Sequence, residues 1–302
     1  MKTDEALRTP DERFQELPDF PYPPAYLDDL PGFEGLRMAR VDEGDGDRVA
    51  LCLHGEPTWS FLYRKMIPPL RQAGLRVVAP DFFGFGRSDK PADDAVYTYR
   101  FHRDSLLALV ERLDLRRITL VVQDWGGILG LTLPLDFPDR IERLVVMNTA
   151  LPTGGSPGPG FEAWKAYVAS QPDLEVGRLM KRAAPTLGDA EVAAYDAPFP
   201  SAAHKAGVRR FPALVPVTPE MEGAETSRRA LAWWSERFDG PSFMAIGMQD
   251  PVLGPEVMGS LRSRIRGCPE PLELADVGHF VQEAGDRVAR AALAAFEAPE
   301  PD

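Results

Sequence analysis

Short apolar segments alternate with segments of helical spacing along much of this 302-residue chain. Apolar runs of strand length occur at residues 49–53, 76–80, 118–122 and 144–147, and again at 242–246 and 271–274. Helical spacing of apolar residues is found at 61–72, 103–113 and 128–135, and in a closing segment at 282–296. Strands that are apolar along their length are buried on both faces. The alternation therefore predicts an α/β fold with a mostly parallel sheet flanked by helices.

One long segment interrupts this alternation. It begins with LPTGGSPGPG (151–160), which is too rich in glycine and proline for a strand or a helix. Helical spacing follows at 161–169, 174–183 and 189–195. We therefore predict an α/β main domain formed by residues 1–150 and 220–302, with residues 151–219 inserted as a helical cap.

The charge balance and the cysteine count limit which binding partners and which cellular compartment we expect for this protein. The chain has 34 basic and 46 acidic side chains, a net charge of −12, which disfavours nucleic acid and anionic membranes as partners. Its two cysteines, Cys52 and Cys268, are too few for a disulfide framework or a four-thiolate zinc site. Residues 1–13 are polar and charged, so we expect no secretion signal, and there is no uninterrupted apolar run of the roughly 18 residues that span a bilayer. We expect a cytoplasmic protein and a monomer.

The string VVQDWGG (121–127) is the most informative in the chain. An apolar strand passes into a turn with Gly126 and Gly127, and a helical pattern follows. This is the setting of a nucleophile elbow, with Asp124 at the position that serine usually occupies. Val122 replaces the first small residue of the usual pattern. An aspartate after a strand can also simply cap the helix, so this string alone leaves both roles open.

A carboxylate nucleophile changes the class of substrate. Attack on an acyl carbon would give an anhydride, whereas attack on a saturated carbon gives an ordinary ester. Asp124 as nucleophile therefore indicates a substrate with an electrophilic sp3 carbon, such as an alkyl halide or an epoxide.

Hydrolysis of such an ester requires a base, and the base requires an acid to orient it. His279 lies in DVGHF (276–280), a loop between the last predicted strand and the closing helix. Asp250 follows another predicted strand and precedes a proline. Alone, each is also typical of an ordinary loop or turn. The chain order Asp124, Asp250, His279 matches the nucleophile–acid–base order of this fold class.

The remaining candidates are weaker. His54, at the end of an early strand, is expected to support a loop, and His102 and His204 are expected at the surface. Asn148 ends another strand, but an amide cannot supply the charge that the base needs.

These residues together resemble the haloalkane dehalogenases of the α/β-hydrolase superfamily. Four ordered blocks carry the match: HGEPTWSFLYRKM (54–66), QDWGG (123–127), GMQDPVLGP (247–255) and GCPEPLELADVGHFVQE (267–283). It continues in the insertion through FEAWK (161–165) and AGVRRFP (206–212). The resemblance implies a helical cap over the active site and hydrolysis of carbon–halogen bonds without a cofactor.

The resemblance also implies roles for further residues. The most similar subgroup binds the leaving halide through two indole N–H groups, which map to Trp125 and Trp164. Trp164 has the alternative of core packing, because it has helical spacing with its apolar neighbours. The family's oxyanion hole maps to the backbone N–H groups of Glu56 and Trp125. Another subgroup has asparagine where Glu56 stands, so Glu56, with Asn148 and Asp250, argues against that subgroup.

The family's pocket lining maps, less specifically, to Ile128, Phe161, Pro212 and Val215. The implied reaction is displacement of halide by Asp124, followed by attack of water activated by His279 on the resulting ester. The expected partners are a small halogenated hydrocarbon and the halide product.

Three other functions compete. An epoxide hydrolase shares the aspartate nucleophile and uses cap tyrosines as acids, for which Tyr167 and Tyr195 are available; Trp164 and the HGEP loop favour halide. A haloacid substrate would favour an arginine near the nucleophile, and residues 123–129 contain none. A non-catalytic ligand-binding member would not need the complete Asp–His–Asp set. DFFGFGRSD (81–89) lacks a GxGxxG and is expected to pack as a loop near the site.

Overall fold

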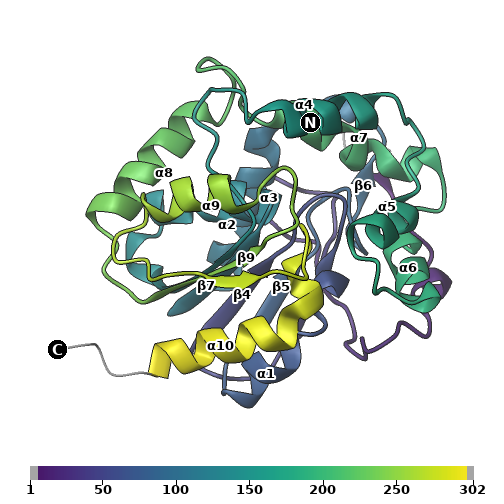
Figure 1. The fold of residues 1–302 in the computed structure, drawn as a ribbon. Coiled ribbons are helices and arrows are strands. Elements are labelled where there is room, and N and C mark those ends of the chain that lie inside the picture. The colour runs from purple at the N-terminus through teal and green to yellow at the C-terminus, as the bar shows by residue number, and fades with distance from the viewer. Residues whose placement is uncertain (1–5, 298–302) are drawn as a thin grey trace.

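A twisted eight-stranded sheet lies between two layers of helices in the computed structural model, which describes residues 6–297 (Figure 1). The strand order is β10-β9-β8-β7-β4-β5-β3-β2. The strands are β2 (Ala25–Leu27), β3 (Met38–Glu43), β4 (Val49–Leu53), β5 (Arg76–Pro80), β7 (Ile118–Gln123), β8 (Ile141–Met147), β9 (Ser242–Gly247) and β10 (Leu272–Leu274). Within the described residues every neighbouring pair is parallel except the two pairs made by β3. The predicted fold class is therefore confirmed.

All six predicted strands form in the sheet, and its two further strands, β2 and β3, were not predicted. Strand β3 was not predicted because its sequence, MARVDE, is only partly apolar. This antiparallel strand ends in two half-buried acidic residues. Strand β2 has only three residues. A separate two-stranded ribbon pairs β1 (Ala6–Leu7) with β6 (Lys90–Pro91).

Helices cover both faces of the sheet (Figure 1). One face carries α1 (Ile67–Gln72) and α10 (Gly285–Glu297), which pack on each other, and the other carries α2 (Tyr99–Arg112), α3 (Trp125–Gly130), α8 (Ala224–Glu236) and α9 (Pro255–Arg262). The helix predicted over 61–72 is divided into a 3-10 turn (Ser60–Tyr63) and α1, because Pro68 and Pro69 fit the first turn of a helix and not its interior. Among residues 6–297, no helix combines the length and apolar character needed to cross a bilayer.

The insertion between β8 and α8 is helical, as predicted. It contains α4 (Pro159–Ala169), α5 (Val176–Ala183), α6 (Asp189–Asp196) and α7 (Ala206–Leu214). In Figure 1, α5 and α6 lie together at the right, and α4 lies above with α7 packed against it. Helix α7 was not predicted, because Pro212 lies inside it. The division at residues 150 and 219 stays a prediction.

The order of the strands indicates where a ligand would bind on the sheet. Strand β4 has β5 on one side and β7 on the other, so the chain turns in opposite directions from β4. In open α/β sheets, ligands bind where the strand order reverses, at the carboxyl ends of the strands. The segments after β4 and β7 contain Glu56 and Asp124.

Candidate active site

Asp124 lies at a strained turn between β7 and α3. Its backbone has φ 50° and ψ −125°, which is an unfavourable region for a residue with a side chain. The turn is tight enough that a Cβ on Gly126 would lie 1.9 Å from the carbonyl oxygen of Leu53, so glycine is required there. The Asp124 carboxylate makes no capping bond to α3; its Oδ1 accepts a hydrogen bond of 2.8 Å from the backbone N–H of Glu56. The geometry is that of an elbow: Asp124 stands at the N-cap position of α3, but its side chain makes no capping hydrogen bond.

The imidazole of His279 lies between the two predicted carboxylates. Its Nδ1 is 2.7 Å from Oδ2 of Asp250, and its Nε2 is 3.6 Å from Oδ2 of Asp124. Burial disfavours the charged imidazole, but Asp250 and Asp124 outweigh it and raise the pKa of His279 to about 10. The structure thus brings together three residues that are separated by up to 155 positions in the chain (279 − 124 = 155).

Asp250 is held in one orientation by hydrogen bonds to both of its oxygens. Oδ1 accepts from the backbone N–H groups of Val252 and Leu253, at 2.9 and 3.1 Å, and Oδ2 accepts from the amide of Asn148 at 2.9 Å. Burial alone would raise the pKa of Asp250, but His279, Asn148 and the backbone amides hold it well below its usual range. Asn148 therefore helps to hold the carboxylate of Asp250 in this orientation.

The loop after β4 brings a backbone donor to the nucleophile. The N–H of Glu56 contacts Asp124, and Trp125, as the first residue of α3, has a backbone N–H with no acceptor inside the helix. The side chain of Glu56 is buried and its Oε1 has no partner among the described residues. Burial and the Asp124 carboxylate raise the pKa of Glu56 well above its usual value. Both effects favour the uncharged form of the Glu56 carboxyl group.

His54 supports this loop, as expected from its position in the sequence. It is buried, its Nδ1 lies 2.9 Å from the carbonyl oxygen of Gly55, and its Nε2 accepts from the N–H of Phe82 at 3.0 Å. Phe82 belongs to the segment 81–89, so this glycine-containing segment packs beside the site as a loop.

Two of the five tryptophans have their indole N–H groups occupied by the protein. Trp59 and Trp234 donate to backbone carbonyl oxygens at 3.1 and 2.7 Å. Trp125 is 3% exposed, and within the described chain no protein group accepts from its indole. Its ring packs on Phe211 of α7, with a centroid distance of 4.6 Å. An indole nitrogen is a donor only, so a buried one without an acceptor is available to a ligand.

Trp164 is half-buried on α4, beside Tyr167, with ring centroids 6.0 Å apart. Its indole also has no acceptor among residues 6–297, and no ring contact joins it to Trp125. The connection between the two is indirect, because α4 packs against α7 and α7 carries Phe211. The residues expected to line a pocket are all buried on α3, α4 and α7 or directly after α7: Ile128, Phe161, Pro212 and Val215.

Two expectations about surface residues need correction or refinement. The expectation for His102 was wrong, since it is fully buried in α2 among aromatic rings, 4.5 Å from the ring centroid of Phe211. Burial lowers its pKa to about 3. His204 is half-buried and pairs with Ser201. His102 was expected to precede a helix beginning at residue 103, whereas α2 begins at Tyr99, so His102 lies within the helix on its buried face.

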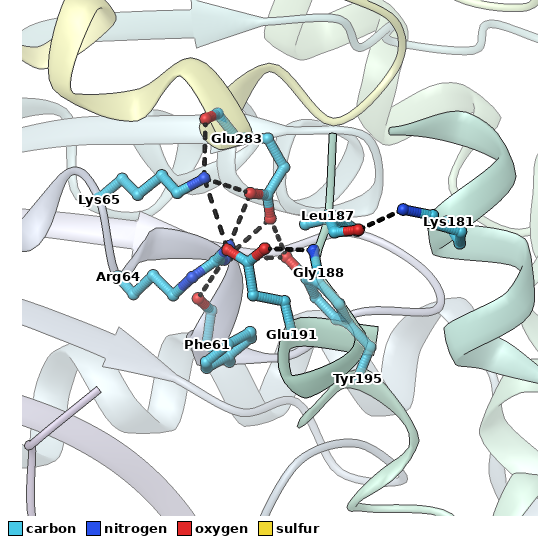
Figure 2. A network of polar contacts seen from close by, with 9 residues as sticks. All are labelled: Phe61, Arg64, Lys65, Lys181, Leu187, Gly188, Glu191, Tyr195 and Glu283. Atoms are coloured by element: carbon cyan, nitrogen blue, oxygen red, sulfur yellow. Dashed lines mark hydrogen bonds and ion pairs between the residues drawn. The ribbon is translucent and has the colours of Figure 1, made fainter. Parts of the chain in front are cut away.

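A buried ionic network links the helical insertion to the segment that carries the base (Figure 2). Arg64 is fully buried and donates to both oxygens of Glu283, at 2.8 and 2.7 Å, and to Glu191 of α6. Tyr195 of α6 donates to Glu283 at 2.5 Å. Glu283 lies four residues after His279. This network was not predicted, because its partners lie far apart in the chain, although Arg64 and Glu283 lie in two of the four blocks of resemblance.

Comparisons with known proteins agree with this geometry. The model of the alpha/beta hydrolase fold matches residues 49–286. The haloalkane dehalogenase of Psychrobacter cryohalolentis is 44% identical over 94% of this chain and 95% of its own length, and that of Mycolicibacterium paratuberculosis is 42% identical over 92% and 93%. The chain belongs to the haloalkane dehalogenase family.

A solved structure of this family extends the agreement to three dimensions. The tetrameric haloalkane dehalogenase DpaA from Paraglaciecola agarilytica NO2 superposes with a TM-score of 0.96 at 52% identity, covering 98% of this chain and all of that one. The expected family is therefore confirmed, and the epoxide hydrolase alternative is not favoured. The expectation of a monomer gains no support, because this haloalkane dehalogenase relative is tetrameric.

Proposed function

We propose that this protein hydrolyses haloalkanes through an ester on Asp124. The observation that carries the proposal is the strained Asp124 turn, with the carboxylate 3.6 Å from Nε2 of His279 and with the buried side chain of Trp125 on the next residue. A nucleophile, its base and a donor for the leaving group thus come from one compact site.

In the first step an oxygen of Asp124 forms a bond to the carbon that carries the halogen, and the carbon–halogen bond breaks with its electron pair on the halide. The indole N–H groups of Trp125 and Trp164 stabilise the developing negative charge. Because indole is an uncharged donor, the halide is not held as tightly as it would be by a cation.

In the second step water attacks the carbonyl carbon of the ester. His279 takes a proton from that water, and Asp250 stabilises the imidazolium. Backbone N–H groups of Glu56 and Trp125 bind the oxyanion. Collapse of the intermediate breaks the bond to the alkoxy group, which takes the proton from His279 and leaves as the alcohol, and the regenerated carboxyl group of Asp124 releases its proton. The balance is haloalkane plus water to alcohol, halide and a proton.

The helical insertion is proposed to act as a cap. Phe161, Pro212 and Val215, with Ile128 of the main domain, would form an apolar lining that suits a halogenated hydrocarbon and excludes water from the first step. The buried position of all four supports this role. The cap boundaries at 151 and 219 and a cytoplasmic location are parts of the same proposal.

The positions of the two cap tyrosines speak against an epoxide substrate. The hydroxyl of Tyr195 is engaged with Glu283 and Arg64 in the network of Figure 2. Tyr167 is 37% exposed. Neither has a free hydroxyl in a buried position, which protonation of an epoxide oxygen requires.

The proposed function is tested by trapping the ester. With His279→Gln, 1-bromobutane should release one equivalent of bromide per protein and then stop, since general-base catalysis contributes about 10²- to 10⁴-fold. Mass spectrometry of a protease digest should find one butyl group on the peptide that contains Asp124. His204→Gln, a histidine outside the site, should keep full turnover. No bromide release by the unmodified protein from a panel of bromoalkanes and chloroalkanes would refute the proposal.

A further inference from the structure

The amide of Gln123 lies against the proposed base and has no role in the mechanism above. Gln123 is the last residue of β7, directly before the nucleophile, and is fully buried. Its Nε2 is 2.8 Å from Nε2 of His279 and 3.2 Å from the backbone carbonyl oxygen of the same residue. This is the ring nitrogen that must accept the proton from water.

The surroundings fix which end of the amide faces the ring. The carbonyl oxygen of His279 can only accept, so the group 3.2 Å from it must be the amide NH2. At the other end, Nε2 of Gln282 donates to Oε1 of Gln123 at 3.5 Å. Rotating the Gln123 amide by half a turn would set oxygen against oxygen and NH2 against NH2. The NH2 group therefore meets the ring, and Nε2 of His279 is the acceptor.

The contact with the Gln123 amide and the contacts with the carboxylates have opposite effects on the protonation of the His279 ring. The titratable groups that face His279 are Asp250 at Nδ1, Asp124 at 3.6 Å from Nε2, and Glu56, which lies next to Asp124. Both aspartates favour a protonated imidazole, which cannot act as a base. A donor directed at Nε2 favours the neutral ring instead, because a proton on Nε2 would face the amide hydrogens.

We propose that Gln123 is a positioning residue that, once the ester on Asp124 has formed, favours the neutral ring of His279 and holds its Nε2 as an acceptor beside the ester until water attacks. The inference rests on the proposed function. When the ester forms, Asp124 loses its charge and one of the two forces favouring the imidazolium disappears. Gln123 then holds a neutral ring, and the water proton replaces the amide hydrogen at Nε2.

The test compares three variants. Gln123→Met keeps the length of the side chain and removes the donor, and Gln123→Glu replaces the donor with an acceptor. The matched control is Gln249→Met, since Gln249 is an exposed amide that donates to the carbonyl of Ala275 near the same loop. Two measurements are made on each: the pH dependence of ester hydrolysis in a single turnover with 1-bromobutane, and the titration of His279 by ¹⁵N NMR of imidazole-labelled protein without substrate.

We expect the acid limb of hydrolysis and the NMR titration of His279 to move up by about one pH unit in Gln123→Met, and further in Gln123→Glu, because a hydrogen bond to the neutral form is lost. Gln249→Met should match the unmodified protein in both. Equal titration of His279 in Gln123→Met and the unmodified protein would overturn the inference, even if halide is released normally. The NMR measurement does not need turnover, so it tests Gln123 even if no haloalkane is hydrolysed, a result that would refute only the proposed function.

Discussion

The helical insertion meets the sheet domain along two junctions of different chemistry. At the first, α6 is tied to the base-bearing segment by Arg64, Glu283, Glu191 and Tyr195, all largely removed from solvent (Figure 2). Lys65 adds a further contact to Glu283 at 2.9 Å. A buried ion pair with several hydrogen bonds has a defined geometry, because each charge would be costly to leave without its partner.

At the second junction, α4 follows the glycine- and proline-rich segment 151–160. Among residues 6–297, no ion pair involves positions 151–169. The first turn of α4 borders a cleft of about 720 Å3, whose other walls are formed by the loop after Asp250 and by α9. Within the described residues this junction therefore lacks the ion pairs that hold the α6 junction.

The difference between the two junctions matches two different requirements of the proposed active site. The base must keep its position to within tenths of an ångström, and the α6 junction supports the segment that carries His279. Substrate must enter and halide must leave, and the α4 junction, which carries Trp164, is the one that can open at lower cost. We expect rigidity and mobility to be divided between the two junctions in this way.

The strongest way to break the α6 junction is Arg64→Met. It removes the only fully buried cation of the network and leaves Glu283, whose side chain is 6% exposed, with Lys65 as its remaining cation. Loss of one partner of a buried pair costs about 3–5 kcal/mol, so we expect a decrease of about 3 kcal/mol in the free energy of unfolding by urea. Arg178→Met, which breaks an exposed pair with Glu175 on α5, should cause little change. Equal urea midpoints for both variants would show that the network does not stabilise the fold.

The pH dependence of stability should show the same junction with a smaller effect. Burial alone would raise the pKa of Glu283, but Arg64, Tyr195 and Lys65 outweigh it and lower the pKa below its ordinary value. A lowered carboxyl pKa stabilises the fold above the unfolded-state pKa, near 4.5. That contribution is lost as pH falls through the folded-state pKa.

Glu283→Gln should therefore be less stable than the unmodified protein at pH 7, and the difference between them should shrink as pH falls below about 5. Urea unfolding at pH 7, 5 and 4 measures it. Glu162→Gln, on α4, is the control and should leave the pH profile unchanged. A Glu283→Gln difference that stays constant across this range would contradict an ionised Glu283 in the network.

The sheet and the proposed reacting groups could be predicted from the sequence because each has a local signal. Buried strands are short apolar runs, and Asp124, Asp250 and His279 each lie in a turn or loop after a predicted strand. Val122, which departed from the elbow pattern, is tolerated because its partner is small: a Cβ on Gly130 would lie 2.9 Å from Cγ1 of Val122. This compensation lies eight positions along the chain, beyond the motif itself.

Interactions between distant segments had no local signal. The bond from Asn148 to Asp250 spans 102 positions, and that from Arg64 to Glu283 spans 219. An amide cannot supply the charge that the base needs, and the contact of Asn148 with Asp250 depends on β8 and β9 being neighbours. Gln123 directly precedes Asp124 in the sequence, but the contact of its amide with His279 exists only in the folded chain.

The smallest expected effect concerns the two tryptophans proposed to bind halide: Trp164 lies at the α4 junction, and Trp125 lies next to the Asp124 turn of the main domain. Trp125 is 3% exposed on the rigid elbow, whereas Trp164 is half-buried on α4. A hydrogen bond to a charged group is worth more when it is shielded from water, so Trp125→Phe should weaken bromide binding about tenfold and Trp164→Phe only about threefold. Quenching of the remaining tryptophan fluorescence by bromide measures both. Trp233→Phe, which removes a half-buried indole of α8, should leave the bromide affinity unchanged. A larger loss for Trp164 than for Trp125 would mean that α4 is held as firmly as the elbow, and the proposed division between the two junctions would fail.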